Sequence, residues 1–295
     1  MNRPEMLLIS LLGFSTTIFA QSGEESAQLI LPIVANGVVG DVLHFQSTFN
    51  FLNLSNSTAE GLLQVYDNGG ELTTDFLLCT PVPTPDPSVK FPFTPGSSIH
   101  HTGITDTPLL SGWGRLTWET SARIEGSVEV TLINAPPHPC LLVCTRPSSE
   151  IVSTTQVPGV RPAKEFRFPV IITENRHSAF ALVNPSNTET ARISLTLLDS
   201  LGQVFRDGDG NRAQIEEYFM APFTRVSQFA WDFFDACDPQ HQICTLPVPT
   251  PAPDLFHGSI QIKSDIPIAV GGLHVLFPEG KIVGLPVETI DSSGS

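Results

Sequence analysis

Residues 180–202 read FALVNPSNTETARISLTLLDSLG, and residues 49–70 read FNFLNLSNSTAEGLLQVYDNGG. Both stretches contain a phenylalanine, an Asn-x-Ser-Asn segment and an Asp-x-x-Gly segment in the same order. Between these segments apolar and polar residues alternate, which is the period of a half-buried β-strand. Asn and Asp side chains bond the local backbone and Gly allows positive φ, so the flanking segments predict turns.

Other parts of the chain repeat in the same order. The further matches pair Leu29–Val34 with Phe166–Ile171, Cys79–Pro85 with Cys244–Pro251, and Gly114–Leu132 with Gly258–Leu276. Because several anchors in one order are improbable by chance, they predict an internal duplication and two homologous domains.

The expected fold is all-β: two tandem immunoglobulin-like antiparallel β-sandwiches. Turn signals about every ten residues, without a long amphipathic helix, are typical of a sandwich. The expected limits are 27–146 for the first domain, with a Pro-rich insertion at 80–112, 147–161 for a linker, 162–289 for the second domain and 290–295 for a flexible tail. We expect each sandwich to own its core, with few contacts between the two.

The composition excludes several classes of function. Charged residues make up 15% of the 295 residues, and prolines number 26, which argues against a charged helical bundle. Asp and Glu number 30 against 15 Lys and Arg, so the net charge is −15. This charge repels phosphate backbones and anionic lipid surfaces, so we expect no nucleic-acid partner.

The N-terminus has the pattern of a signal peptide. Arg3 precedes an apolar run from Met6 to Ala20, which is too short to span a bilayer comfortably. We expect a signal peptide over residues 1–20, cleaved after Ala20, and no membrane span in the mature chain. The expected location is secreted, periplasmic or at the cell surface.

The five cysteines suit an oxidising compartment. Cys237 and Cys244 enclose a short turn-like loop, so we expect them to form a disulfide. Cys140 and Cys144 are four residues apart, and either is a candidate partner for Cys79. The odd count leaves one free thiol or an intermolecular bridge.

The second copy of the repeat resembles a module common in exported bacterial proteins. The resemblance is carried by Asn184–Asn187, Leu198–Gly202 and Gly258–Ala269. Those modules are tandem immunoglobulin-like β-sandwiches without an assigned function. The resemblance implies this fold, most directly for 162–289, and it implies no catalytic residues. The first copy departs from the pattern where Arg123-Ile124 replaces Pro267-Ile268.

The sequence contains no local catalytic motif for a nucleophile elbow, a zinc protease or a phosphate loop. The candidate metal ligands are Asp207, Asp209 and Asn211, whose oxygens resemble the first half of a calcium loop. The loop departs from that pattern because Arg212 replaces its glycine and Tyr218 its glutamate. A hairpin turn explains the same residues without a metal.

Seven aromatic residues lie within Tyr218–Phe234. They fill a core in one interpretation and stack on carbohydrate in the other. From these patterns we expect an exported, non-catalytic structural or interaction module, without a cofactor, whose partner is an unknown protein or glycan at the cell surface. The alternative is a carbohydrate- or calcium-binding β-sandwich module, and a hydrolase with a Ser-His-Asp set drawn from distant segments comes third.

Overall fold

Among the residues that the computed structural model describes, every named element is a strand, which confirms the all-β prediction. The described residues are 27–39, 43–73, 77–79, 88–104, 109–119, 121–134, 150–206, 210, 212–230, 255–277 and 281–290. The expected signal peptide lies outside these residues. Within them, we find no helix with the length and apolar character that crossing a membrane requires.

The first half of the molecule, strands β1 to β9, forms two layers. Its strands are β1 (Ala27–Val39), β2 (Leu43–Asn53), β3 (Ala59–Asp67), β4 (Leu77–Cys79), β5 (Ser88–Phe93), β6 (Ser98–Ile104), β7 (Leu110–Trp118), β8 (Ile124–Asn134) and β9 (Glu150–Pro158). One layer has the order β5-β3-β7-β1, and the other has the order β4-β6-β2-β8-β9. Strand β1 joins them, because residues 27–36 pair with β7 and residues 37–39 pair with β2.

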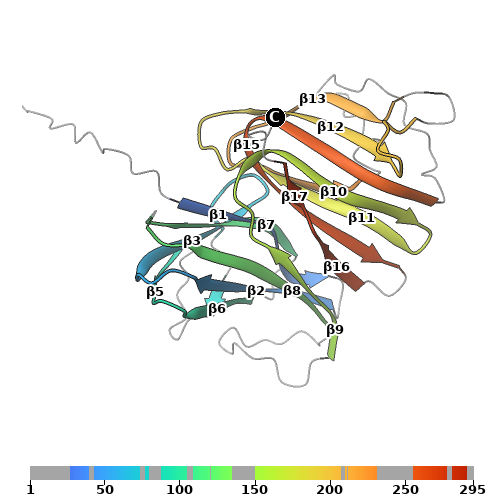
Figure 1. Ribbon diagram of the computed structural model, residues 1–295. Coiled ribbons are helices and arrows are strands. Elements are labelled where there is room, and N and C mark those ends of the chain that lie inside the picture. Colours follow the sequence, from blue (N-terminus) through green and yellow to red (C-terminus); the bar gives the residue numbers. More distant parts are fainter. Residues whose placement is uncertain are drawn as a thin grey trace, which may run out of the picture.

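The second half, strands β10 to β17, lies beside the first (Figure 1). Its strands are β10 (Ala163–Thr173), β11 (Arg176–Val183), β12 (Ala191–Asp199), β13 (Gln214–Met220), β14 (Arg225–Phe229), β15 (Leu255–Leu276), β16 (Lys281–Leu285) and β17 (Glu288–Thr289). The long strand β15 serves both layers. Its first part pairs with β10 and β12, and its last part pairs with β11 and β16.

The two halves have the same pattern of strand pairing. Judged by their pairing partners, the second-half counterparts of β1, β2, β3, β5, β6 and β9 are, in that order, β10, β11, β12, β13, β14 and β16. The single strand β15 takes the place of both β7 and β8. The sequence of buried and exposed positions along β3 is identical to that along β12. Gly112 and Gly258 are therefore counterparts, since they pair with Asp67 and Asp199 respectively.

The turns predicted from the sequence form in both halves. Asn53 and Asn184 are fully buried, and each accepts a backbone N–H two residues later, from Ser55 and Ser186. Each side-chain amide also donates to backbone carbonyls of the strand or turn beside it. These buried amides fix the chain entering β3 and β12, because leaving their polar atoms unpaired would cost free energy.

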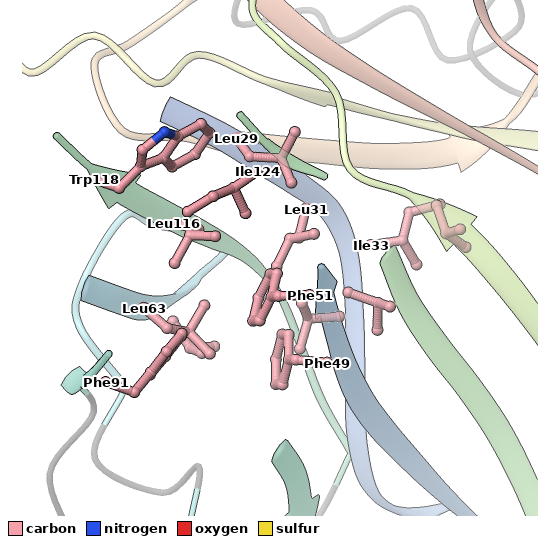
Figure 2. Close-up of a cluster of buried hydrophobic side chains, with 14 of the residues drawn as sticks. Leu29, Leu31, Ile33, Phe49, Phe51, Leu63, Phe91, Leu116, Trp118 and Ile124 are labelled. Atoms are coloured by element: carbon pink, nitrogen blue, oxygen red, sulfur yellow. The ribbon is translucent and has the colours of Figure 1, made fainter. Parts of the chain in front are cut away.

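Aromatic and aliphatic side chains fill the space between the layers of the first half. Figure 2 shows Phe49 and Phe51 from β2 facing Leu31 of β1 and Leu116 of β7. This core also includes Ala181 and Ile282 from the second half. The second half has a separate core of its own residues, among them Phe166, Phe168 and Phe180.

The structure differs from three expectations about organisation. Residues 150–158, within the expected linker, form β9 and pair with β8 along its length. The expected insertion 80–112 contains β5, β6 and the start of β7, which belong to the layers. Contacts between the halves are extensive rather than few, since one apolar cluster contains residues of both. The sequence composition misled here because Ser and Thr suit linkers and exposed strands alike.

Candidate functional site

The candidate calcium ligands Asp207, Asp209 and Asn211 lie outside the described residues. On either side of them, Arg206 and Arg212 form an antiparallel bridge, and the Arg206 guanidinium donates to the Gly210 carbonyl at 2.7 Å. No group of three His, Cys, Asp or Glu that could hold a metal ion occurs in the described part of the chain. Calcium binding at this loop therefore stays a prediction.

The cysteines are also largely beyond what the structure describes. Cys237, Cys244, Cys140 and Cys144 all lie outside the described residues. The backbone of Cys79 pairs with Thr102 in the β4–β6 ladder. The predicted bond between Cys237 and Cys244 stays a prediction.

Ser178 and His274 form a serine–histidine contact in the second half, with 3.0 Å between Oγ and Nδ1. Ser178 is fully buried, and its hydroxyl also accepts the Ile171 N–H and donates to the Ile171 carbonyl. Burial and the nearby Arg176 charge lower the pKa of His274. Ser47 bonds the backbone N–H and carbonyl of Ala35 in the same way. Each serine therefore links two neighbouring strands, Ser178 joining β11 to β10 and Ser47 joining β2 to β1.

Arg225 is a charged residue that is buried between the two halves. It begins β14, it is 6% exposed, and burial lowers its pKa to about 10. Its partners are three neutral oxygens of the first half: the Pro32 carbonyl at 2.8 Å, Asn68 Oδ1 at 2.7 Å and Ser111 Oγ at 2.6 Å. The guanidinium therefore stays charged at neutral pH and ties the second half to three separate segments of the first.

Beside Arg225, Phe223 stacks on two rings of the first half. Its centroid lies 5.3 Å from Tyr66 and 5.9 Å from Trp113, with the ring planes about 20° apart. Arg115 lies over the rings of Tyr66 and Phe223 and donates to the Tyr66 hydroxyl. Cation–π contacts of this kind add to the apolar burial.

The backbone of Phe223 is strained in this position. Its φ of 58° is in the left-handed region that residues with a Cβ rarely adopt. A side chain at Gly70 would overlap the Phe223 backbone, so the two segments are in close contact. We call this whole contact the junction. Its first-half face includes Ile30, Pro32, Tyr66, Asn68, Gly70, Ser111, Trp113 and Arg115.

The described aromatic residues of the Tyr218–Phe234 stretch, which could stack on carbohydrate, lie in different environments. Phe223 is in the junction, and Tyr218 packs against the core of the second half. Phe219 is exposed, while Trp231, Phe233 and Phe234 lie outside the described residues. Phe229 and Phe277 are 6.2 Å apart but tilted by 50°. The near-coplanar rings are therefore those of the junction, where Trp113 is fully buried.

A groove of about 630 Å³ lies on the outer face of the β12-β15-β10 layer. Its polar lining includes Arg167, His257, Ser259 and Glu288, and the Arg167 Nε donates to Ser259 Oγ at 3.1 Å. The turn at Asp199 to Gly202 forms one wall. Among the residues that the structure describes, no carboxylate forms an ion pair with Arg167.

Neither the junction nor the groove is marked by a sequence motif. Arg225 follows a Pro-Phe-Thr turn and resembles any surface arginine in the sequence. Comparison of the chain with protein-family models, with curated proteins and with solved structures found no match.

Proposed function

We propose that the chain is an exported, non-catalytic structural or interaction module that presents two β-sandwiches as one rigid body. The observation that carries this proposal is the junction. A buried arginine, an aromatic stack and an apolar cluster join the two halves, and each would be disrupted by a small rotation of one half. Rigid coupling suits a spacer or scaffold better than a hinged binding protein.

Internal duplication of an immunoglobulin-like unit is part of the same proposal. The recurring strand pairings support it, as do the buried Asn53 and Asn184 and the serine bonds of Ser47 and Ser178. Export rests on the signal-like residues 1–20 and on the cysteine content.

The surroundings of Ser178 support a non-catalytic role. A nucleophilic serine needs access to substrate and an acceptor for its proton. The hydroxyl of Ser178 already bonds both backbone groups of Ile171, and the side chain is fully buried. The bond to His274 is therefore explained by the packing of β11 against β15.

The proposal is tested with the purified chain starting at Gln21. The protein is offered ester, peptide and glycoside substrates, with Ser178→Ala as the matched variant, and we expect no turnover by either. Turnover that disappears in Ser178→Ala would contradict the non-catalytic role. Export is tested separately by expressing the full chain and determining the N-terminus of the released protein. We expect Gln21, and retention of Met1 in the cytoplasm would refute export.

A further inference from the structure

The sequence contains two Asn-Gly pairs, Asn36-Gly37 and Asn68-Gly69. An asparagine before glycine readily loses its side-chain amide, because glycine has no side chain to hinder attack by its own backbone nitrogen. That nitrogen bonds to the asparagine Cγ, ammonia leaves, and a five-membered cyclic imide forms. Water then opens the imide to aspartate or to isoaspartate. The surroundings of each pair decide whether this reaction proceeds in the folded protein.

Asn68 and Gly69 are the exposed central residues of the turn that follows β3. The Gly70 N–H closes this turn by donating to the Asp67 carbonyl at 3.3 Å. Within the described part of the chain, the Gly69 N–H donates to no acceptor, whereas the N–H of its counterpart Leu201 donates to a carboxylate oxygen at 2.9 Å. The nitrogen that must attack is therefore available without breaking a hydrogen bond.

The other pair, Asn36-Gly37, lies inside strand β1. Asn36 is 1% exposed and pairs with Leu110 of β7, while Gly37 pairs with Phe45 of β2. Closing an imide ring at Asn36 would distort the backbone at the point where these two ladders meet. We therefore expect Asn36 to keep its amide for as long as the chain stays folded, which makes it an internal reference for Asn68.

The buried guanidinium of Arg225 lies on the side-chain oxygen of Asn68. Its Nη1 donates to Asn68 Oδ1 at 2.7 Å, and the Arg225 backbone N–H donates to the Asn68 carbonyl at 3.0 Å. Attack at Cγ gives Oδ1 a negative charge, and a desolvated cation within hydrogen-bond distance stabilises that charge as the donors of an oxyanion hole do. The fold therefore holds a donor on the atom that becomes negative.

The same guanidinium favours one of the two products. Opening the imide at Cγ restores the ordinary main chain and leaves a carboxylate, whereas opening at the backbone carbonyl gives isoaspartate. Because the charged donor lies on the Cγ oxygen, we expect water to attack Cγ. The resulting carboxylate faces a guanidinium whose described partners are all neutral oxygens. Arg225 is desolvated before the reaction, so the ion pair adds attraction at little further cost.

We propose that Asn68 is a site of spontaneous deamidation, and that the aspartate formed there pairs with Arg225 and strengthens the junction. In total the chain takes up one water molecule and releases one molecule of ammonia, and no oxidant or reductant takes part. The inference goes beyond the proposed structural role, because it concerns the covalent chemistry of the chain itself.

The reaction is tested by incubating the folded chain from Gln21 in mildly alkaline buffer. Peptide mapping by mass spectrometry, with fragmentation that separates aspartate from isoaspartate, follows both Asn-Gly pairs. We expect Asn68 to convert mainly to aspartate while Asn36 stays intact. A synthetic peptide of residues 64–73 is the unfolded reference and should give mainly isoaspartate. Gly69→Ala should slow the conversion several-fold, because the turn accommodates its Cβ while the methyl group hinders attack.

The ion pair is tested with Asn68→Asp in urea unfolding. This variant should unfold at a higher urea concentration than the original chain, and the gain should vanish when Arg225→Met is also present. Asn56→Asp is the control, because it adds the same charge in the exposed turn before β3 and should not raise the midpoint. The proposal is overturned if Asn68 converts no faster than Asn36, if isoaspartate dominates in the folded chain, or if Asn68→Asp brings no gain. Each of these results would leave the proposed structural role standing.

Discussion

Arg225 shows how a single residue can hold two sheets together at the cost of burying a charge. Its guanidinium is satisfied by oxygen atoms that carry no formal charge, so the contact provides hydrogen bonds without neutralising the cation. Hydrogen bonds to a charged group are stronger than neutral ones, and they are directional. The residue therefore fixes the orientation of the halves as well as their proximity.

Replacing Arg225 with methionine should lower the free energy of unfolding by about 1–3 kcal/mol. The methionine keeps much of the side-chain volume but leaves the Asn68 and Ser111 oxygens without their donor. Urea unfolding measures the change. Arg123→Met is the control, because Arg123 is exposed and should change stability by less than about 0.5 kcal/mol. Equal losses in the two variants would show that the buried bonds contribute nothing specific.

His274 makes stability depend on pH in a defined direction. Because its pKa is lowered in the folded state, the unfolded chain binds the proton more readily. The stabilisation is complete above the ordinary histidine pKa of about 6.5, and it is lost as pH falls through the lower folded value. The free energy of unfolding should therefore be smaller at about pH 5 than at about pH 7.5.

His274→Gln isolates this contribution from that of other titrating groups. Glutamine can still bond Ser178 but does not take up a proton, so the variant should lose less stability between the two pH values than the original chain. Chemical denaturation at both pH values gives the comparison. If the two proteins lose stability equally between these pH values, burial of His274 is not the cause of the pH dependence.

Sequence patterns predict some residues of the site and not others. The Asn-x-Ser-Asn and Asp-x-x-Gly segments predict their turns because the hydrogen bonds that form these turns join residues close together in the sequence. Arg225 and Phe223 could not be found in this way, because their partners lie more than a hundred positions away in the chain. Phe223 is additionally hidden because its positive φ is a conformation expected at glycine, as at Gly96.

At the scale of the elements, Gly112 of β7 and Gly258 of β15 occupy equivalent positions in the two halves. A side chain at Gly112 would overlap the Tyr66 carbonyl oxygen, and one at Gly258 would overlap that of Leu198. The neighbouring strands are therefore in close backbone contact at the same point of each half. Since the obstacle is backbone in each case, it cannot move aside as a flexible side chain would.

Gly112→Ala and Gly258→Ala should each destabilise the chain by about 2–3 kcal/mol, measured by thermal or urea unfolding. Gly69→Ala is the control, because its Cβ would make only an ordinary contact with Asp67. A tolerated alanine at one glycine and a damaging one at the other would argue against equivalent positions.

Element boundaries were the weaker part of the sequence prediction. Alternation identified β3 and β12 correctly, because one of their faces is buried and the other is not. Strand β9 escaped detection because its burial is partial and its sequence mixes Ser and Thr with Val and Ile. The same difficulty applies to β5 and β6, which lie in a Pro-rich stretch. Composition alone does not separate an edge strand from a linker.

At the scale of the whole molecule, the two halves contribute unequally to the cores. The buried residues of the second core all lie in the second half, and Val160, between β9 and β10, packs against them. The core of the first half is completed by Ala181 and Ile282, and Leu273 and Val275 also pack against it. The core of the first half therefore includes residues of the second half, contrary to the expectation that each sandwich owns its core.

This asymmetry predicts different behaviour of the separated halves. Residues 162–289 should fold alone with a cooperative thermal transition, at a lower midpoint than in the whole chain because the junction is lost. Residues 27–161 should unfold at a still lower temperature or fail to show a sharp transition, since separation exposes the apolar side chains that Ala181 and Ile282 cover. Differential scanning calorimetry of both fragments and of the chain from Gln21 measures this order. A first-half fragment that is more stable than the second would show that the shared core contributes little, and the junction would then be a contact between independent domains.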